Sequence, residues 1–310
     1  MIPQGLIRFG GAAGRVGLLF VAVSMASTAA ADPAAASSCP AEYAGGRVPV
    51  ISNPKLSDRL RELCFRQFAV HHSGVTATPL FVSQRLTADM VRQAKAVDRE
   101  DVFHEEDRLP ETERASLAHY RKSGYDRGHM APAADMATKG AQDDSFSLAN
   151  MVPQLPELNR RSWAEVEETA RNLALSYGEV FLVTGPAFAG DKLTAIGGRV
   201  IVPTHVYKAV FIPSTGQASA WWADNSTGRM EVVSVAELAE RIGADVFPAA
   251  SQSVKQSGVA LPLPRQVGTA PRKPDGGVVG DGGGSWKDAV VAFLVGFLEN
   301  LLRAIWRAVA

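Results

Sequence analysis

The segment SGYDRGHMAP at residues 123–132 is followed by NMVPQ at 150–154 and by NRRSW at 159–163. The apolar pattern of residues 125–130 and 146–152, which overlap the first two segments, is typical of short strands. From the start of the third segment, apolar residues recur on one helical face as far as Tyr177, and Gly178 is placed to end the helix. The order strand, strand, helix is therefore predicted, with a histidine on the first strand and an asparagine at the helix start.

Each polar residue of these segments has an ordinary structural explanation when it is considered alone. His129 could be a hydrogen-bonded strand residue, and Asn159 could cap the helix. Glu167 and Arg171, four residues apart, could form an exposed ion pair contributing about 0.3 kcal/mol. Their joint placement is what indicates chemistry.

Phosphodiester hydrolysis needs an activated water, positive charge on the nonbridging oxygens and help for the departing oxygen. A neutral imidazole on His129 suits the first task. Arginine suits the second because a guanidinium stays charged and grips phosphate with two parallel hydrogen bonds. A hard cation such as Mg2+ suits the third and needs few protein ligands, so Asn159, with Glu167 holding metal-bound water, would suffice.

With these segments the chain resembles the DNA/RNA non-specific endonuclease family, whose members include mitochondrial endonuclease G and secreted bacterial nucleases. The resemblance covers residues 39–250 and includes Cys64, Arg99 and the TGP run at 184–186. It implies an α+β domain with the ββα-metal nuclease fold, in which helices flank a central, mostly antiparallel sheet.

The resemblance also implies an activity and a site. The expected protein is a sugar-non-specific endonuclease that uses Mg2+, or Mn2+, and leaves 5′-phosphate and 3′-hydroxyl ends on DNA and RNA. The implied site comprises His129 as general base, Asn159 as direct metal ligand, Glu167 as holder of metal-bound water, Arg99, Arg127 and Arg171 at the scissile phosphate, and Asn150 to orient His129 or the metal-binding residues. The alternative is a catalytically silent protein of the same fold that binds nucleic acid or acts as a membrane-tethered adaptor.

The sequence lacks the motifs of several other classes of protein. There is no GxSxG, HExxH or CxxC run and no phosphate-cradling glycine loop, which excludes serine hydrolases, zinc proteases and nucleotide-binding proteins. The remaining histidines are expected to be structural or exposed; they are His71, His72, His104, His119 and His205.

The N-terminus has the three parts of a secretory signal peptide. Arg8 and Arg15 precede an apolar run at 16–25, and small residues end at Ala31, where cleavage is expected. The alternative, an uncleaved anchor, is weakened by the shortness of the run. An exported protein, periplasmic or secreted, is predicted.

The predicted export and cleavage affect the charge of the mature chain and the state of its two cysteines. The 32 basic and 32 acidic residues become 30 and 32, so tight global electrostatic binding to nucleic acid is not expected. Cys39 and Cys64, both in the exported part, are expected to form a disulfide that stabilises the fold by roughly 3 kcal/mol. Two unpaired buried thiols are the alternative.

The rest of the chain divides into sheet, linker and tail. The expected strands are 68–72, 179–185, 204–213 and 218–223; residues 60–67 suggest the end of a helix, 86–95 a helical or irregular segment, and 235–242 a helix capped by Ser234. Residues 251–285 are predicted to be a Pro/Gly-rich linker. An apolar amphipathic helix is expected over 286–310. It could bind a membrane surface, or it could serve for docking and self-association in a homodimer.

Overall fold

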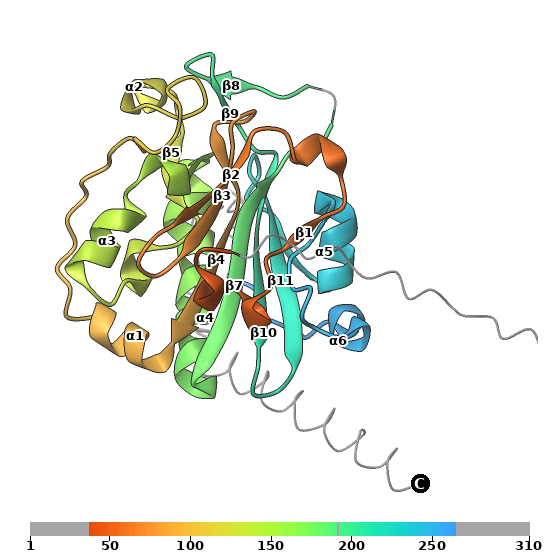
Figure 1. Cartoon of the computed structure of the whole chain (residues 1–310). Helices are drawn as coiled ribbons and strands as arrows, with labels where there is room; N and C mark the ends of the chain where they lie inside the picture. The colour runs from red at the N-terminus through yellow and green to blue at the C-terminus, as the bar shows by residue number, and fades with distance from the viewer. Residues whose placement is uncertain (1–36, 191, 265–310) are drawn as a thin grey trace, which may run out of the picture. The chain divides into compact units, whose positions relative to one another are not determined.

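The computed structural model describes residues 37–190 and 192–264. A seven-stranded sheet lies at its centre, in the order β12-β11-β10-β7-β4-β3-β2, and every neighbouring pair is antiparallel (Figure 1). Its strands are β2 Leu60–Cys64, β3 Ala69–Ser73, β4 Thr78–Thr87, β7 Glu179–Ala187, β10 His205–Ile212, β11 Gln217–Asp224 and β12 Met230–Val233. The predicted α+β class with a central antiparallel sheet is confirmed.

Three two-stranded ladders and six α-helices complete these parts of the chain. The ladders are β1 Val50–Ile51 with β13 Ala244–Asp245, β5 Asp126–His129 with β6 Met151–Gln154, and β8 Ala195–Ile196 with β9 Val200–Ile201. The helices are α1 Ala88–Ala94, α2 Leu117–Tyr120, α3 Lys139–Ser145, α4 Trp163–Tyr177, α5 Val235–Ile242 and α6 Gln252–Ser257. Short turns of other helix types are η1 Pro40–Glu42, η2 Ala44–Gly46, η3 Pro54–Leu56, η4 Ala133–Asp135, η5 Leu148–Asn150 and the π-helical η6 Leu158–Ser162.

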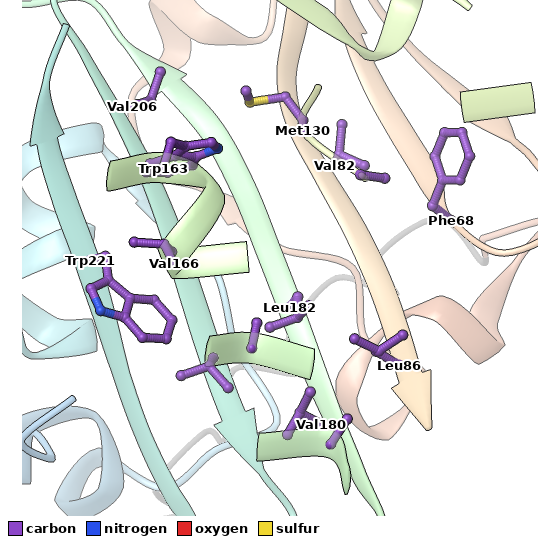
Figure 2. Packing of buried hydrophobic residues seen from close by; sticks show 14 of the residues in the cluster. Phe68, Val82, Leu86, Met130, Trp163, Val166, Val180, Leu182, Val206 and Trp221 are labelled. Atoms are coloured by element: carbon purple, nitrogen blue, oxygen red, sulfur yellow. The ribbon is translucent and has the colours of Figure 1, made fainter. Parts of the chain in front are cut away.

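The sheet is buried on both faces, with α1, α3 and α4 on one side and α5 and α6 on the other (Figure 1). Successive strand residues point to opposite faces. Trp221 accordingly joins the cluster that holds Trp163 of α4, whereas Trp222 joins the cluster that holds Leu238 of α5. Figure 2 shows the first cluster, where Trp163 and Val166 pack over the strands. Burying each large side chain stabilises the fold by about 1.5–3 kcal/mol.

The helix α4 matches its prediction closely. Its apolar stripe faces the sheet, and Gly178 ends it with φ +88°, a conformation that side chains with a Cβ rarely adopt. The chain enters α4 through the π-helical turn η6, and such turns are frequent at functional sites. Asn159 lies within that turn, so the site residue is presented just before the regular helix begins.

One sequence prediction in the sheet region is wrong, and one strand was not predicted. Residues 60–64 form the edge strand β2 rather than the end of a helix. The central strand β4 runs to Thr87, where the side chain then caps α1 by accepting a hydrogen bond from the Met90 amide. Because nearly every residue of β4 is buried, its sequence lacks the polar alternation that marks a half-buried strand.

The second predicted strand of the site also differs from its expected bounds. Residues 148–150 form the turn η5, and the strand β6 begins only at Met151. The Ser147 hydroxyl accepts a hydrogen bond from the Ala149 amide, which favours a turn at this point. The site strand is therefore shorter than its apolar run.

The start of the predicted linker is packed against the sheet. Residues 252–257 form α6, capped by Ser251, and the Trp221 indole nitrogen donates to the Pro262 carbonyl at 2.9 Å. The Gln- and Ser-rich composition concealed this helix because its burial depends on tertiary contacts. Residues 265–285 of the predicted linker, the predicted signal peptide at 1–31 and the predicted helix at 286–310 lie outside the described residues. Among the described helices, none is long and apolar enough to span a membrane.

The predicted disulfide is confirmed. Cys39 and Cys64 are bonded, with their Cα atoms 5.7 Å apart. The bond fastens the start of the described chain to β2, which is an edge strand of the sheet.

Candidate active site

The strand β5, the turns η4 and η6 and the helices α2 and α4 line a cavity of about 750 Å3, together with the loop at residues 99–103. His129 lies opposite Met151 in the two-stranded ladder. Glycine is required at the preceding position, Gly128, because a Cβ there would lie 2.1 Å from Oε1 of the buried Gln154. The polar residues lining the cavity include Arg99, Asp101, Arg121, Asp126, Arg127, His129, Asn159, Arg160 and Glu167.

Aromatic rings hold the His129 imidazole in place. The Phe146 ring meets it edge-on at 5.1 Å between centroids, and the Phe103 ring lies 5.7 Å away. Nε2 is buried without a hydrogen-bond partner among the described residues. Burial lowers the histidine pKa to about 3, helped by the positive charge of Arg99 and Arg127. The imidazole is therefore neutral near pH 7, which is the form that a general base needs.

Asn159 is oriented by Asp126 from the first strand. The amide nitrogen Nδ2 of Asn159 donates to Oδ2 of Asp126 at 2.9 Å, and Arg160 binds both carboxylate oxygens at 2.8 and 2.6 Å. Since the amide nitrogen is engaged, Oδ1 is the atom that remains for a ligand. The sequence reading gave Asp126 and Arg160 no role, although both belong to the quoted segments.

The three predicted phosphate-binding arginines occupy different places. Arg127 lies over the Phe103 ring at 4.0 Å and lines the cavity, as does Arg99, whose Nε donates to Asp101 at 2.6 Å. Arg171 does not line this cavity. Its Nη1 donates to the buried Asp135 at 3.0 Å, beside a neighbouring cavity.

Asn150 is fully buried and does not contact the imidazole. Its side chain accepts from the Ala131 amide and donates to the carbonyls of Ala131 and Ser145, each at 2.9 Å. The Met130 amide donates to the Asn150 carbonyl at 3.0 Å. Asn150 thus fixes the backbone that follows the histidine, and any effect on His129 passes through that backbone.

A buried charged group that the sequence reading missed lies behind Glu167. Lys208 of β10 is fully buried and donates to Oγ1 of Thr184 at 2.7 Å and to the Met130 carbonyl at 3.3 Å. Burial raises the pKa of Glu167, and the charges of Lys208 and Arg171 oppose this rise. The one available signal was a lysine inside the otherwise apolar run HVYKAVFI at 205–212.

The other described histidines lie outside the cavity that His129 lines. His71 stacks on Phe81, His205 stacks on Trp222, and His119 takes part in a capping box. In the described part of the chain, one group of three His, Cys, Asp or Glu ligand atoms is compact enough for a metal, namely Cys39, Glu62 and Cys64. Its two cysteines are joined in the disulfide, so this group is not a metal site.

The chain belongs to the DNA/RNA non-specific endonuclease family, whose model matches residues 50–253. Nuclease C1 of Cunninghamella echinulata is 38% identical over 155 residues, covering 46% of this chain and 62% of the relative. Endonuclease G of Homo sapiens is 37% identical over 152 residues, covering 46% and 51%. The chain thus spans about half to three fifths of the curated relatives it matches.

A solved structure supports the same fold. In a crystal structure of the EndoG/EndoGI complex, concerned with EndoG inhibition, one chain matches with a TM-score of 0.56 and 26% identity. The match covers 62% of this chain and 88% of that chain. The resemblance inferred from the three segments is confirmed.

The predicted export is contradicted by these relatives. Human endonuclease G is named a mitochondrial enzyme, as are nucleases of Schizosaccharomyces pombe and Saccharomyces cerevisiae, each 35% identical over 158 residues; these cover 47% and 46% of this chain and 49% and 48% of the relatives. The names point to mitochondria rather than to a periplasmic or secreted protein. Residues 1–31 are acid-free and contain Arg and Ser, which mitochondrial transit peptides share with signal peptides.

Proposed function

We propose that this chain is a Mg2+-dependent endonuclease that hydrolyses DNA and RNA without regard to the sugar, leaving 5′-phosphate and 3′-hydroxyl ends. The observation that carries the proposal is that His129, Asn159 and Glu167 line one cavity, with the imidazole neutral at physiological pH. A proton acceptor, an amide oxygen and a carboxylate therefore face the same space, together with Arg99 and Arg127.

The residues divide the work of hydrolysis among them. His129 accepts the proton of the attacking water, for which its neutral form is required. Arg127 and Arg99 bind the nonbridging oxygens, where negative charge accumulates in the transition state. The aromatic contacts of Phe103 and Phe146 keep these groups aligned, and fixed geometry is itself a large part of catalysis.

The donor set fits a magnesium ion. Mg2+ prefers oxygen ligands, keeps several waters and needs only one or two protein groups. Asn159 would hold it through Oδ1, and Glu167 would hold the waters bound to it. When bound, the ion would stabilise the charge on the departing 3′ oxygen. Mn2+ prefers the same type of ligand and should substitute.

The test is cleavage of supercoiled plasmid and of RNA by the purified protein, with Mg2+ or with chelator. We expect cutting of both substrates with Mg2+, and products that a ligase joins without a kinase step. His129→Ala should be slower by about 10²–10⁴-fold, the usual contribution of a general base. His104→Ala, at an exposed position, is the matched control.

Two outcomes would contradict the proposal. Equal cutting by wild type and His129→Ala would show that the histidine is not the base. Binding of nucleic acid without any Mg2+-dependent cutting would instead support the catalytically silent alternative.

A further inference from the structure

A second cavity, of about 330 Å3, adjoins the catalytic cavity. The two share Arg99, Ala133 and Ala134 in their walls. The second cavity lies between α1 with the turn that follows it and α4, two helices that pack against each other. A ligand that occupies it is therefore an immediate neighbour of whatever reacts at His129.

The charge of this cavity favours an anion, although the whole chain has no net charge. Its charged lining consists of Lys95, Arg99 and Arg171 against the single acid Glu168. Lys95 is exposed and forms no salt bridge with any described residue. Arg99 and Arg171 each use part of the guanidinium on an aspartate, which leaves further N–H groups to donate.

The rest of the lining suits a nucleobase. Apolar wall is supplied by Val91, Ala94, Val97 and Leu175, and Asn172 adds an amide with no hydrogen bond to the described residues. Apolar walls with a few polar groups are the usual composition of small-molecule sites, whose volumes begin at about 300 Å3. The second cavity has room for a single nucleotide unit.

We propose that the second cavity binds one unpaired nucleotide of the substrate strand, next to the nucleotides that flank the scissile phosphate. Lys95 and Arg171 bind its phosphate, and its base lies against the wall formed by Val97 and Leu175. The inference rests on the proposed nuclease function and adds a strand preference to it. A base can enter such a cavity only when it is not stacked in a duplex, so single strands are the favoured substrate.

The test is a chain-length series of single-stranded substrates from two to six nucleotides, cleaved by the full chain with Mg2+. A dinucleotide supplies only the two flanking nucleosides, so longer substrates should gain in kcat/KM once a further nucleotide reaches the second cavity. Lys95→Glu should reduce the gain in kcat/KM about tenfold, mainly by raising KM. Its kcat/KM for the dinucleotide should stay within twofold of the wild-type value. The variant's binding should also depend less on salt. The slope of the logarithm of its affinity against the logarithm of the salt concentration should be shallower by about 0.7, as expected for one lost phosphate contact on a single strand.

Lys55→Glu makes the same charge change at an exposed position far from the cavity lining and should match the wild type. A second variant, Val97→Trp, fills the cavity mouth without changing charge and should also suppress the gain with length. If both cavity variants keep the wild-type length profile, the subsite is overturned while the nuclease function stands. If the wild type cleaves plasmid and RNA but no substrate in the series gains with length, the subsite alone is overturned; if it cleaves none of these substrates, the proposed function is overturned and the subsite with it.

Discussion

At the scale of single residues, the candidate metal ligand depends on a neighbour's carboxylate. Asp126 holds the amide nitrogen of Asn159 and is itself held by Arg160. Without that carboxylate the amide can rotate and present its nitrogen, which cannot bind a cation. Partners of this kind commonly change metal affinity by about 10–100-fold.

We therefore predict that Asp126→Ala raises the Mg2+ concentration for half-maximal cleavage by about 10–100-fold. The maximal rate at saturating Mg2+ should fall much less, because His129 and its aromatic neighbours are untouched. Asp89→Ala removes a carboxylate from an exposed i,i+3 ion pair and is the control. An unchanged Mg2+ requirement in Asp126→Ala would contradict the orienting role of this carboxylate.

The sequence revealed those site residues that lie close together along the chain. His129, Asn159 and Glu167 were found because two short strands and a helix bring nearby segments together. Lys208 was not found, since its contact with the Met130 carbonyl joins residues 78 positions apart. Pairings at that separation are set by the sheet order, which the local pattern does not encode.

At the scale of elements, the strand β10 reaches the site through this lysine. Lys208 connects β10 to Thr184 of β7 and to the backbone that follows β5. It also supplies positive charge beside Asp135 and Glu167. Removing one member of a buried charged group typically costs about 3–5 kcal/mol, because the other members lose their compensation.

We predict that Lys208→Met loses both stability and activity per folded molecule. The free energy of unfolding, measured with urea, should fall by about 3 kcal/mol. The cleavage rate under conditions where the variant remains folded should fall at least tenfold, since the Met130 backbone loses an anchor next to His129. Lys255→Met is the matched control, because this buried lysine binds Asp245 away from the cavity and should lose stability alone. Full activity in folded Lys208→Met would limit Lys208 to a structural role.

The elements predicted correctly are the strands β3, β7, β10 and β11, whose sequences are mainly apolar, and helices with one apolar face. In α4 the apolar stripe and Gly178 marked both the face and the end, and the capping box of Ser234 marked the start of α5. The strand β4 was missed because the buried polar residues Ser83 and Gln84 interrupt its apolar run, and α6 because its sequence is polar. A local pattern thus identifies an element that is apolar throughout or on one face better than one whose sequence mixes polar and apolar residues.

At the scale of the whole molecule, neutrality conceals an uneven distribution of charge. The chain has 32 basic and 32 acidic residues, yet basic residues outnumber acidic ones in the lining of both cavities. Several histidines contribute no charge, because burial keeps them in the neutral form. The pKa of His72 is lowered by burial to about 4, and neither ring nitrogen has a hydrogen-bond partner among the described residues.

This burial makes stability depend on pH in a definite direction. The unfolded chain protonates a histidine near pH 6.5, whereas folded His72 does so only near pH 4. Between those values the unfolded state binds the extra proton, so stability falls as the pH falls, by up to about 1.4 kcal/mol per pH unit for each such histidine. Above pH 6.5 both states are neutral and the effect vanishes.

We predict that His72→Leu unfolds with a shallower pH dependence than the wild type between pH 6.5 and 4. Urea unfolding at several pH values should give a slope smaller by up to one proton, because one titrating group has been removed. At pH 7 the variant should be as stable as the wild type or more stable, since two unpaired buried nitrogens are lost. His104→Leu, at an exposed position, should keep the wild-type slope. Equal slopes for His72→Leu and wild type would mean that His72 takes up its proton in the folded state as readily as in the unfolded chain.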